Sequence, residues 1–129
     1  MPLQTAIATI MIDACVNGST FPTWTNLFAS LHSTSIALSE TSAGSGEVTG
    51  GSYTRQDVSW GAAANGAAAN DVAVEFATMP QTTVYWTCLN TSSSGGGTIV
   101  WSDELTASKS LTAGDTFRYA IGALTATST

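Results

Sequence analysis

The chain has 129 residues, of which only 9% are charged, and its formal net charge is −6. This length predicts one domain that buries about two-thirds of the surface of its unfolded chain. The three basic residues cannot form the clustered positive face that nucleic-acid binding requires, and no apolar run reaches the ~20 residues of a membrane span, so we expect neither nucleic acid nor a membrane as a partner.

The first 18 residues predict the one helix of the chain. Apolar residues recur at helical spacing on one face, and they are Leu3, Ile7, Ile10, Met11 and Ala14. Ile12 and Val16 widen this stripe beyond what one small sheet needs to cover. The helix therefore either docks on its own domain or packs against another chain, and Leu3, Ile7 and Ile10 are the candidate interface residues.

From residue 19 onward, short apolar runs and turn residues alternate. The runs predict strands over Thr23–His32, Ile36–Leu38, Tyr53–Trp60, Asp71–Phe76, Val84–Leu89, Thr98–Trp101, Ser108–Leu111 and Thr116–Ala126. Polar loops are expected at Thr41–Ser52 and Asn90–Gly97, and a turn at Thr112–Asp115. Seven or eight short strands after one helix indicate a mainly β fold, an antiparallel β-sandwich of jelly-roll-like form. The helix occupies residues 1–18, and residues 19–129 make one sandwich domain.

The stretch between Gly50 and Phe76 is expected to organise the fold. The pentapeptide GAAAN occurs twice in it, at residues 61–65 and 66–70, and predicts a small-residue connection that lies flat on a packed surface. In the strand that follows, Val72, Val74 and Phe76 are expected to share one face. In strand Val84–Leu89, the side chains of Val84, Trp86 and Cys88 are expected to do the same. Trp60, Phe76 and Phe117 are predicted core residues.

No combination of residues predicts an enzyme, a cofactor or a metal site. His32 is the one histidine, and no Gly-x-Ser-x-Gly turn supports a serine nucleophile. Asp103 and Glu104 form the one adjacent acidic pair, but the spacing of a calcium loop is missing. Cys15 and Cys88 are expected to be free thiols in a reducing compartment.

Arg55 is the most notable cation. It is followed at two residues by Asp57, so it either forms an ion pair within its own sheet or contacts an acidic neighbouring chain. Both readings stay open, and Arg55 is the fourth candidate interface residue.

Two segments carry a resemblance to a known family. They are the GGSYTRQ sequence at residues 50–56, followed by the Ala/Asn/Gly run into a Val-x-Phe strand, and the LTASKSLTAGDTFRYAIGAL sequence at residues 105–124. In both, the chain resembles small tailed-phage structural proteins, which are labelled head-decoration or tail-fibre proteins; Leu111 stands where that family usually has valine. The resemblance implies a non-enzymatic protein of the virion, assembled in the cytoplasm of a host bacterium.

Three functional hypotheses follow. The first is a protein that decorates or cements a capsid as a homo-oligomer, most simply a trimer, bound to the major capsid protein or another virion protein. The second is a tail-fibre module that binds a host glycan through exposed Trp24 or Trp101 and the loops Thr41–Ser52 and Asn90–Gly97. The third is a cellular carbohydrate-binding domain.

Overall fold

The computed structural model describes residues 1–42 and 44–128, and the fold is mainly β, as the sequence predicts. Its elements are α1 (Thr5–Asn17), β1 (Phe28–His32), β2 (Gln56–Asp57), β3 (Ala67–Ala69), β4 (Val74–Phe76), β5 (Thr82–Asn90), β6 (Ile99–Leu111), β7 (Phe117–Tyr119) and β8 (Thr125–Thr127). All pairings between these strands are antiparallel. No helix in this part of the chain is long and apolar enough to span a membrane.

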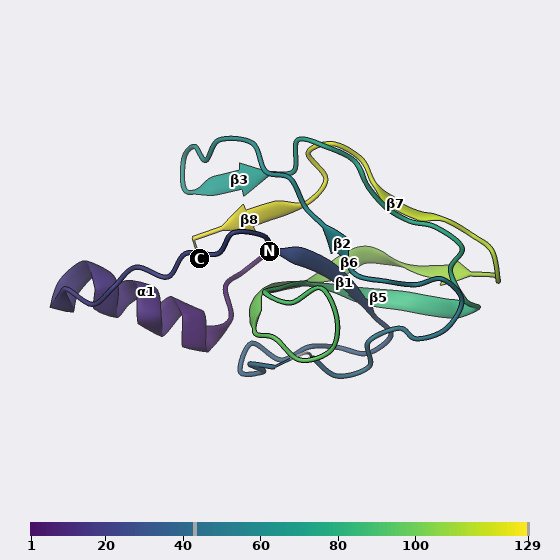
Figure 1. Cartoon of the computed structure of the whole chain (residues 1–129), viewed down its shortest axis with the longest axis horizontal. Helices are drawn as coiled ribbons and strands as arrows, with labels where there is room; N and C mark the ends of the chain where they lie inside the picture. Colours follow the sequence, from purple (N-terminus) through teal and green to yellow (C-terminus); the bar gives the residue numbers. More distant parts are fainter. Residues whose placement is uncertain (43, 129) are drawn as a thin grey trace.

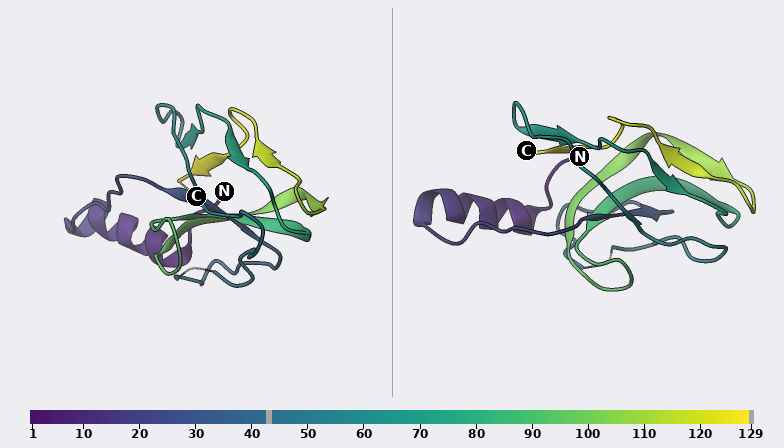
Figure 2. Two further views of the ribbon diagram at one scale, coloured as in Figure 1. Left: turned by 45° about the vertical axis from the view of Figure 1, so that its right-hand side comes forward. Right: turned by 45° about the horizontal axis from the view of Figure 1, so that its top comes forward.

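The strands form two layers. A four-stranded sheet has the order β2-β1-β5-β6, and two ribbons, β3-β8 and β4-β7, cover one of its faces (Figure 1). Helix α1 lies beyond one end of these layers, so that much of it stands away from the sheets (Figure 2). This layered arrangement is that of an antiparallel sandwich, although the strand orders do not confirm the jelly-roll variant.

The main core lies between the four-stranded sheet and the ribbons. Phe76 of β4 and Phe117 of β7 are buried, as predicted, with their ring centroids 6.0 Å apart in an edge-to-face arrangement. Trp60 is only partly buried and packs against the rim of this cluster. The ribbon β4-β7 therefore supplies the aromatic filling of the core.

Val72 does not share the buried face expected for it, because 56% of its surface is exposed. The buried side chain of Asn70 explains the difference. Its amide nitrogen donates to the carbonyls of Val72 and Ala120, and its oxygen accepts from the backbone of Leu124. The backbone is thus turned to satisfy Asn70, and strand β4 begins only at Val74.

The GAAAN repeat forms a hairpin rather than a flat connection. Asn65 and Gly66 have φ angles of 53° and 76°, and Ala64 and Ala67 exchange two backbone hydrogen bonds across them. These features define a tight turn of the type that matches the twist of a β-hairpin. The residues after the turn form β3, which pairs with β8.

Several predicted strands have other bounds in the structure. Residues 19–27 run beside α1, so β1 starts at Phe28. Of the predicted Tyr53–Trp60 strand, only Gln56–Asp57 forms a strand, and Trp60 makes an isolated bridge to Asn70. Residues 36–38 form no strand; Ile36 is buried and Leu38 is exposed. The two predicted strands at 98–101 and 108–111 are one strand, β6, whereas 116–126 divides into β7 and β8 around a turn.

A large bulge interrupts the pairing of β5 with β6. Val84 lies opposite Lys109 and Trp86 opposite Glu104, so four residues of β6, Leu105–Ser108, face Tyr85 alone. The irregularity changes which residues of β5 point into the main core. Val84 lies in that core, but Cys88 and Trp86 pack on the opposite face of the sheet with Ile36 and Ile99, contrary to the expectation of a common face.

Candidate functional site

Arg55 joins two loops at one end of the four-stranded sheet. Its Nη2 and Nε atoms donate to the two carboxylate oxygens of Glu47 at 2.8 and 2.9 Å. Its Nη1 atom donates to the carbonyl oxygens of Ser92 and Gly96 at 2.9 and 3.3 Å. Arg55 is buried, and its ion-pair partner is Glu47 and not the nearby Asp57. The guanidinium therefore fastens the loop before β2 to the loop between β5 and β6.

Tyr53 extends this network into the sheet. Its hydroxyl donates to Glu47 at 2.9 Å and accepts from the backbone nitrogen of Leu31 at 3.0 Å. Burial raises the pKa of Tyr53. For Glu47, burial acts to raise the pKa, but the hydrogen bonds from Arg55 and Tyr53 outweigh it, and the pKa lies below its ordinary value.

His32 lies under the same loop with both ring nitrogens engaged. Nδ1 donates to the carbonyl oxygen of Ser45 at 2.9 Å, and Nε2 accepts from the hydroxyl of Ser30 at 2.8 Å. Burial lowers the pKa of His32 and so favours the neutral form of its imidazole. With both nitrogens bonded to the protein itself, His32 supports the packing of the loop and offers no free base to a substrate.

The two loops that Arg55 joins enclose a pocket of about 280 Å³. Its lining combines polar residues with the apolar side chain of Val48 and the ring of Tyr53; the polar residues include Glu47, Thr54, Arg55, Ser93 and Ser94. Neither of the predicted sugar-stacking residues lines it. Trp24 and Trp101 instead pack beside α1, and the Nε1 atom of Trp101 donates to the carbonyl oxygen of Thr127. The structure thus brings the two predicted loops together without the tryptophans.

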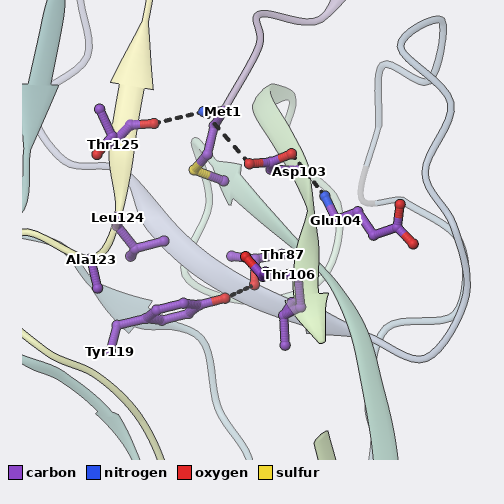
Figure 3. A pocket seen from close by; sticks show the side chains of 10 residues that line it. Met1, Thr87, Asp103, Glu104, Thr106, Tyr119, Ala123, Leu124 and Thr125 are labelled. Atoms are coloured by element: carbon purple, nitrogen blue, oxygen red, sulfur yellow. Dashed lines mark hydrogen bonds and ion pairs between the residues drawn. The ribbon is translucent and has the colours of Figure 1, made fainter. Parts of the chain in front are cut away.

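A second pocket, of about 250 Å³, lies between β6 and the ribbon layer (Figure 3). The hydroxyl of Tyr119 bonds to that of Thr87 inside it, and burial raises the pKa of Tyr119 to about 12. Asp103 lies 3.7 Å from the amino group of Met1, which donates to the carbonyl oxygen of Thr125. Across residues 1–42 and 44–128, no three His, Cys, Asp or Glu side chains form a group that could hold a metal ion.

The candidate interface residues of the helix do not lie together on the surface. Leu3 precedes α1 and pairs with Trp101, and both Leu3 and Ile7 are buried against Val100. Ile10 is 43% exposed. The structure therefore uses one side of the predicted stripe to dock α1 on its own chain.

A different face of α1 lines an apolar groove of about 340 Å³. Its residues are Leu3, Ala8, Met11, Ile12, Cys15, Val16, Phe21 and Ser128. In the sequence, Ile12 and Val16 only widen the predicted stripe, and no pattern there points to Phe21. The helical residues of the groove, Ala8, Met11, Ile12, Cys15 and Val16, recur at three- and four-residue spacing. A helical projection of the sequence therefore contains the signal for this second face.

Comparison with protein-family models gives one finding that spans almost the whole chain. The model described as "Podophage GP4 fiber I protein gp80" matches residues 2–127. A search of curated proteins found no match to the chain. The family match agrees with the phage resemblance carried by residues 50–56 and 105–124. The chain belongs to the podophage GP4 fibre I protein gp80 family.

Proposed function

We propose that this virion structural protein is a non-enzymatic subunit of a phage fibre, held in the particle by contacts with other virion chains. The observation that carries the proposal is the family match over residues 2–127, because the family is described as a fibre protein. The placement in the fibre replaces capsid decoration as the favoured reading, and it corresponds to the second hypothesis from the sequence.

The polar interior supports a structural role. Three buried or half-buried side chains of a kind that serves acid–base chemistry, His32, Tyr53 and Glu47, all bond to groups of the protein itself. A catalytic group needs a partner and an accessible reacting atom at the same place. Here the charged and hydroxyl groups instead fix two loops on the end of a sheet.

We further propose that the subunit is a homo-oligomer, with three copies as the expected number, and that α1 is its attachment element. Ile12 and Val16 are 61% and 70% exposed, and Phe21 is exposed beside them. Large apolar side chains gathered on one surface mark sites of protein association. Assembly of the subunit takes place in the cytoplasm of the host bacterium.

Antibody labelling of purified virions tests the placement. Antibodies raised against the purified protein and coupled to gold should mark the fibres in electron micrographs. Gold spread over the head would instead support capsid decoration, with the major capsid protein as the partner. Intact virions whose proteins include no copy of this chain by mass spectrometry would contradict a structural role of either kind.

Glycan contact by the fibre is a second candidate, and the pocket between the loops favours it. Its hydroxyl and carboxylate groups are of the kind that hydrogen-bond sugars. Ser94→Trp would fill the pocket and should reduce binding of the protein to host surface polysaccharide by tenfold or more. Ser108→Trp on β6 is the matched control and should leave binding unchanged. Equal binding of polysaccharide by both variants would exclude the pocket as the glycan-binding site.

A further inference from the structure

A groove of about 640 Å³ lies between the second half of β6 and strand β7. Residues of β6 between Leu105 and Leu111 form one side, and residues 116–119 form the other. The turn that joins the two strands lies at the end of the molecule away from α1 (Figure 1). Because Lys109 and Arg118 both line this space, we call it the cationic groove. It shares no lining residue with the pocket between the loops.

The bulge in β6 explains why a space is present here. Residues 105–108 lack one-to-one partners on β5, and an irregularity of this kind bends the strand that carries it. Leu105, Thr106 and Ala107 of the bulge line the groove. Among the described strands, β6 pairs with β5 and β7 pairs with β4, so the facing edges of β6 and β7 are not bonded to each other. The two edges are therefore open to a ligand between them.

Two of the three basic residues of the chain meet in the cationic groove. The third, Arg55, is buried in its ion pair with Glu47. Lys109 is exposed, and its side chain has no ion pair or hydrogen bond with any described residue. Of the described residues that line the groove, none is Asp or Glu. In a chain with a net charge of −6, this groove is thus a local site that attracts an anion.

Arg118 keeps free donors at the edge of the groove. Its Nε atom donates to Oε1 of Glu75 at 3.1 Å, and both side chains are more than half exposed. Its Nη1 and Nη2 atoms bond to no other described residue. Two adjacent N–H groups of a guanidinium match the two oxygens of a carboxylate. Arg118 can therefore bind a carboxylate while it remains bonded to Glu75.

The rest of the lining fits a sugar chain better than a peptide. It combines hydroxyl groups with partly buried apolar and aromatic side chains, as sites for small molecules do. These residues are Thr106, Ser110, Thr116, Leu105, Leu111 and Tyr119. An extended peptide would add to a regular strand edge, and the bulge removes that regularity from β6.

We propose that the cationic groove binds an acidic oligosaccharide, with Lys109 and Arg118 paired to carboxylates of its sugars. This site is separate from the pocket between the loops, and it does not depend on where in the virion the chain is placed. The hydroxyl groups of the groove bind the sugar hydroxyls, and the two cations select sugars that carry a carboxylate over neutral ones.

Calorimetric titration with tetragalacturonate, a chain of four uronic acids, tests the groove. The wild type should bind it, and added salt should weaken the binding. Lys109→Gln and Arg118→Gln should each weaken it by about tenfold, whereas Lys109→Arg should bind as the wild type does. Both side chains are exposed, so the variants should fold. Thr9→Glu on α1 is the matched control, because it makes the net charge more negative by the same single unit far from the groove and should leave the affinity unchanged.

Four results would overturn the proposal. The first is a wild type that does not bind tetragalacturonate, and the second is an equal loss of affinity in Lys109→Gln and Thr9→Glu. The third is equally tight binding of neutral maltotetraose or of hexaglutamate, since the groove would then select neither charge nor sugar. The fourth is loss of binding in Ser94→Trp but not in Lys109→Gln, which would place the acidic sugar in the pocket between the loops. None of these results bears on the fibre assignment, which the gold labelling of virions tests separately.

Discussion

The guanidinium of Arg55 and the carboxylate of Glu47 form a two-pronged ion pair, with bonds of 2.8 and 2.9 Å, between segments that are eight residues apart. The other donors of Arg55 bind carbonyl groups of the loop between β5 and β6. Because all of these bonds are made within one chain, Arg55 is a poor candidate for a contact with an acidic neighbour. Of the two roles that the sequence left open for Arg55, an ion pair within the chain is the one present in the structure.

Replacing Arg55 should destabilise the protein strongly. Arg55→Met leaves Glu47 without its partner in a half-buried position, and we expect a loss of about 3 kcal/mol in the free energy of unfolding. Urea denaturation followed by tryptophan fluorescence measures it. Arg118→Met is the matched control, because Arg118 pairs with Glu75 in the open and its loss should cost less than about 1 kcal/mol. A similar loss in both variants would show that burial of the pair does not matter.

Stability should fall in acid in two steps that have different causes. The pKa of His32 is lowered in the fold, so below its ordinary value of 6.5 the unfolded chain binds a proton that the folded chain does not. The pKa of Glu47 is also lowered, so its contribution is present above the ordinary value of 4.5 and is lost as the pH falls below it. Unfolding free energies at pH 7, 5.5 and 4 measure both steps.

His32→Gln should remove the first step and leave the second. Its unfolding free energy should change little between pH 7 and 5.5, whereas that of the wild type falls. An unchanged fall in the variant would assign the step to another group.

Truncating the aromatic core should cost more than truncating an exposed residue of the same segment. Phe76→Ala and Phe117→Ala each leave a cavity between the sheet and the β4-β7 ribbon. Each should lower the free energy of unfolding by about 3–5 kcal/mol. Val72→Ala should cost less than about 0.5 kcal/mol, because Val72 is exposed. Thermal unfolding of the three variants gives the comparison. Near-wild-type melting of both phenylalanine variants would place these rings outside the core.

The two thiols should differ in reactivity. Cys15 is exposed, whereas burial raises the pKa of the Cys88 thiol, and the thiolate is the reactive form. In the folded protein, iodoacetamide should modify Cys15 and leave Cys88 unmodified; after unfolding, both should react. Peptide mass spectrometry under non-reducing conditions reads out each site. A Cys88 that reacts as fast as Cys15 in the folded state would show that its strand opens readily.

The turn of the β3 hairpin offers a backbone test. Gly66 has a φ of 76°, and a Cβ atom there would lie 3.1 Å from the hydroxyl oxygen of Ser128. Gly66→Ala should therefore lower the free energy of unfolding by about 1 kcal/mol or more. Gly61→Ala in the preceding repeat unit is the control. Gly61 has no positive φ, and its added Cβ would meet only ordinary contacts, so its cost should be smaller. Equal costs would mean that the turn geometry is not limiting.

The periodic parts of the sequence predicted the mainly β class, the helix and the buried Phe76 and Phe117. The predictions that were wrong concern places where a side chain or an irregular backbone sets the structure. Asn70 bends the chain before β4, and the bulge opposite Tyr85 changes the faces of β5, and neither leaves a periodic signal. Asn65–Gly66 is a recognised hairpin signal that the alanine repeat around it obscured. The Arg55–Glu47 pair lies within the loop before β2, so no strand register could have indicated it.

The bulge in β6 also bears on how copies behave when they are crowded. β6 is an outer strand of its sheet, and a long, straight outer strand would invite another chain to add to it. The bulge, in which four residues of β6 lie opposite one residue of β5, breaks that regularity. Lys109 at the end of the bulge adds a charge that opposes the addition of another chain. The bulge and Lys109 therefore disfavour the edge-to-edge addition of another chain to β6.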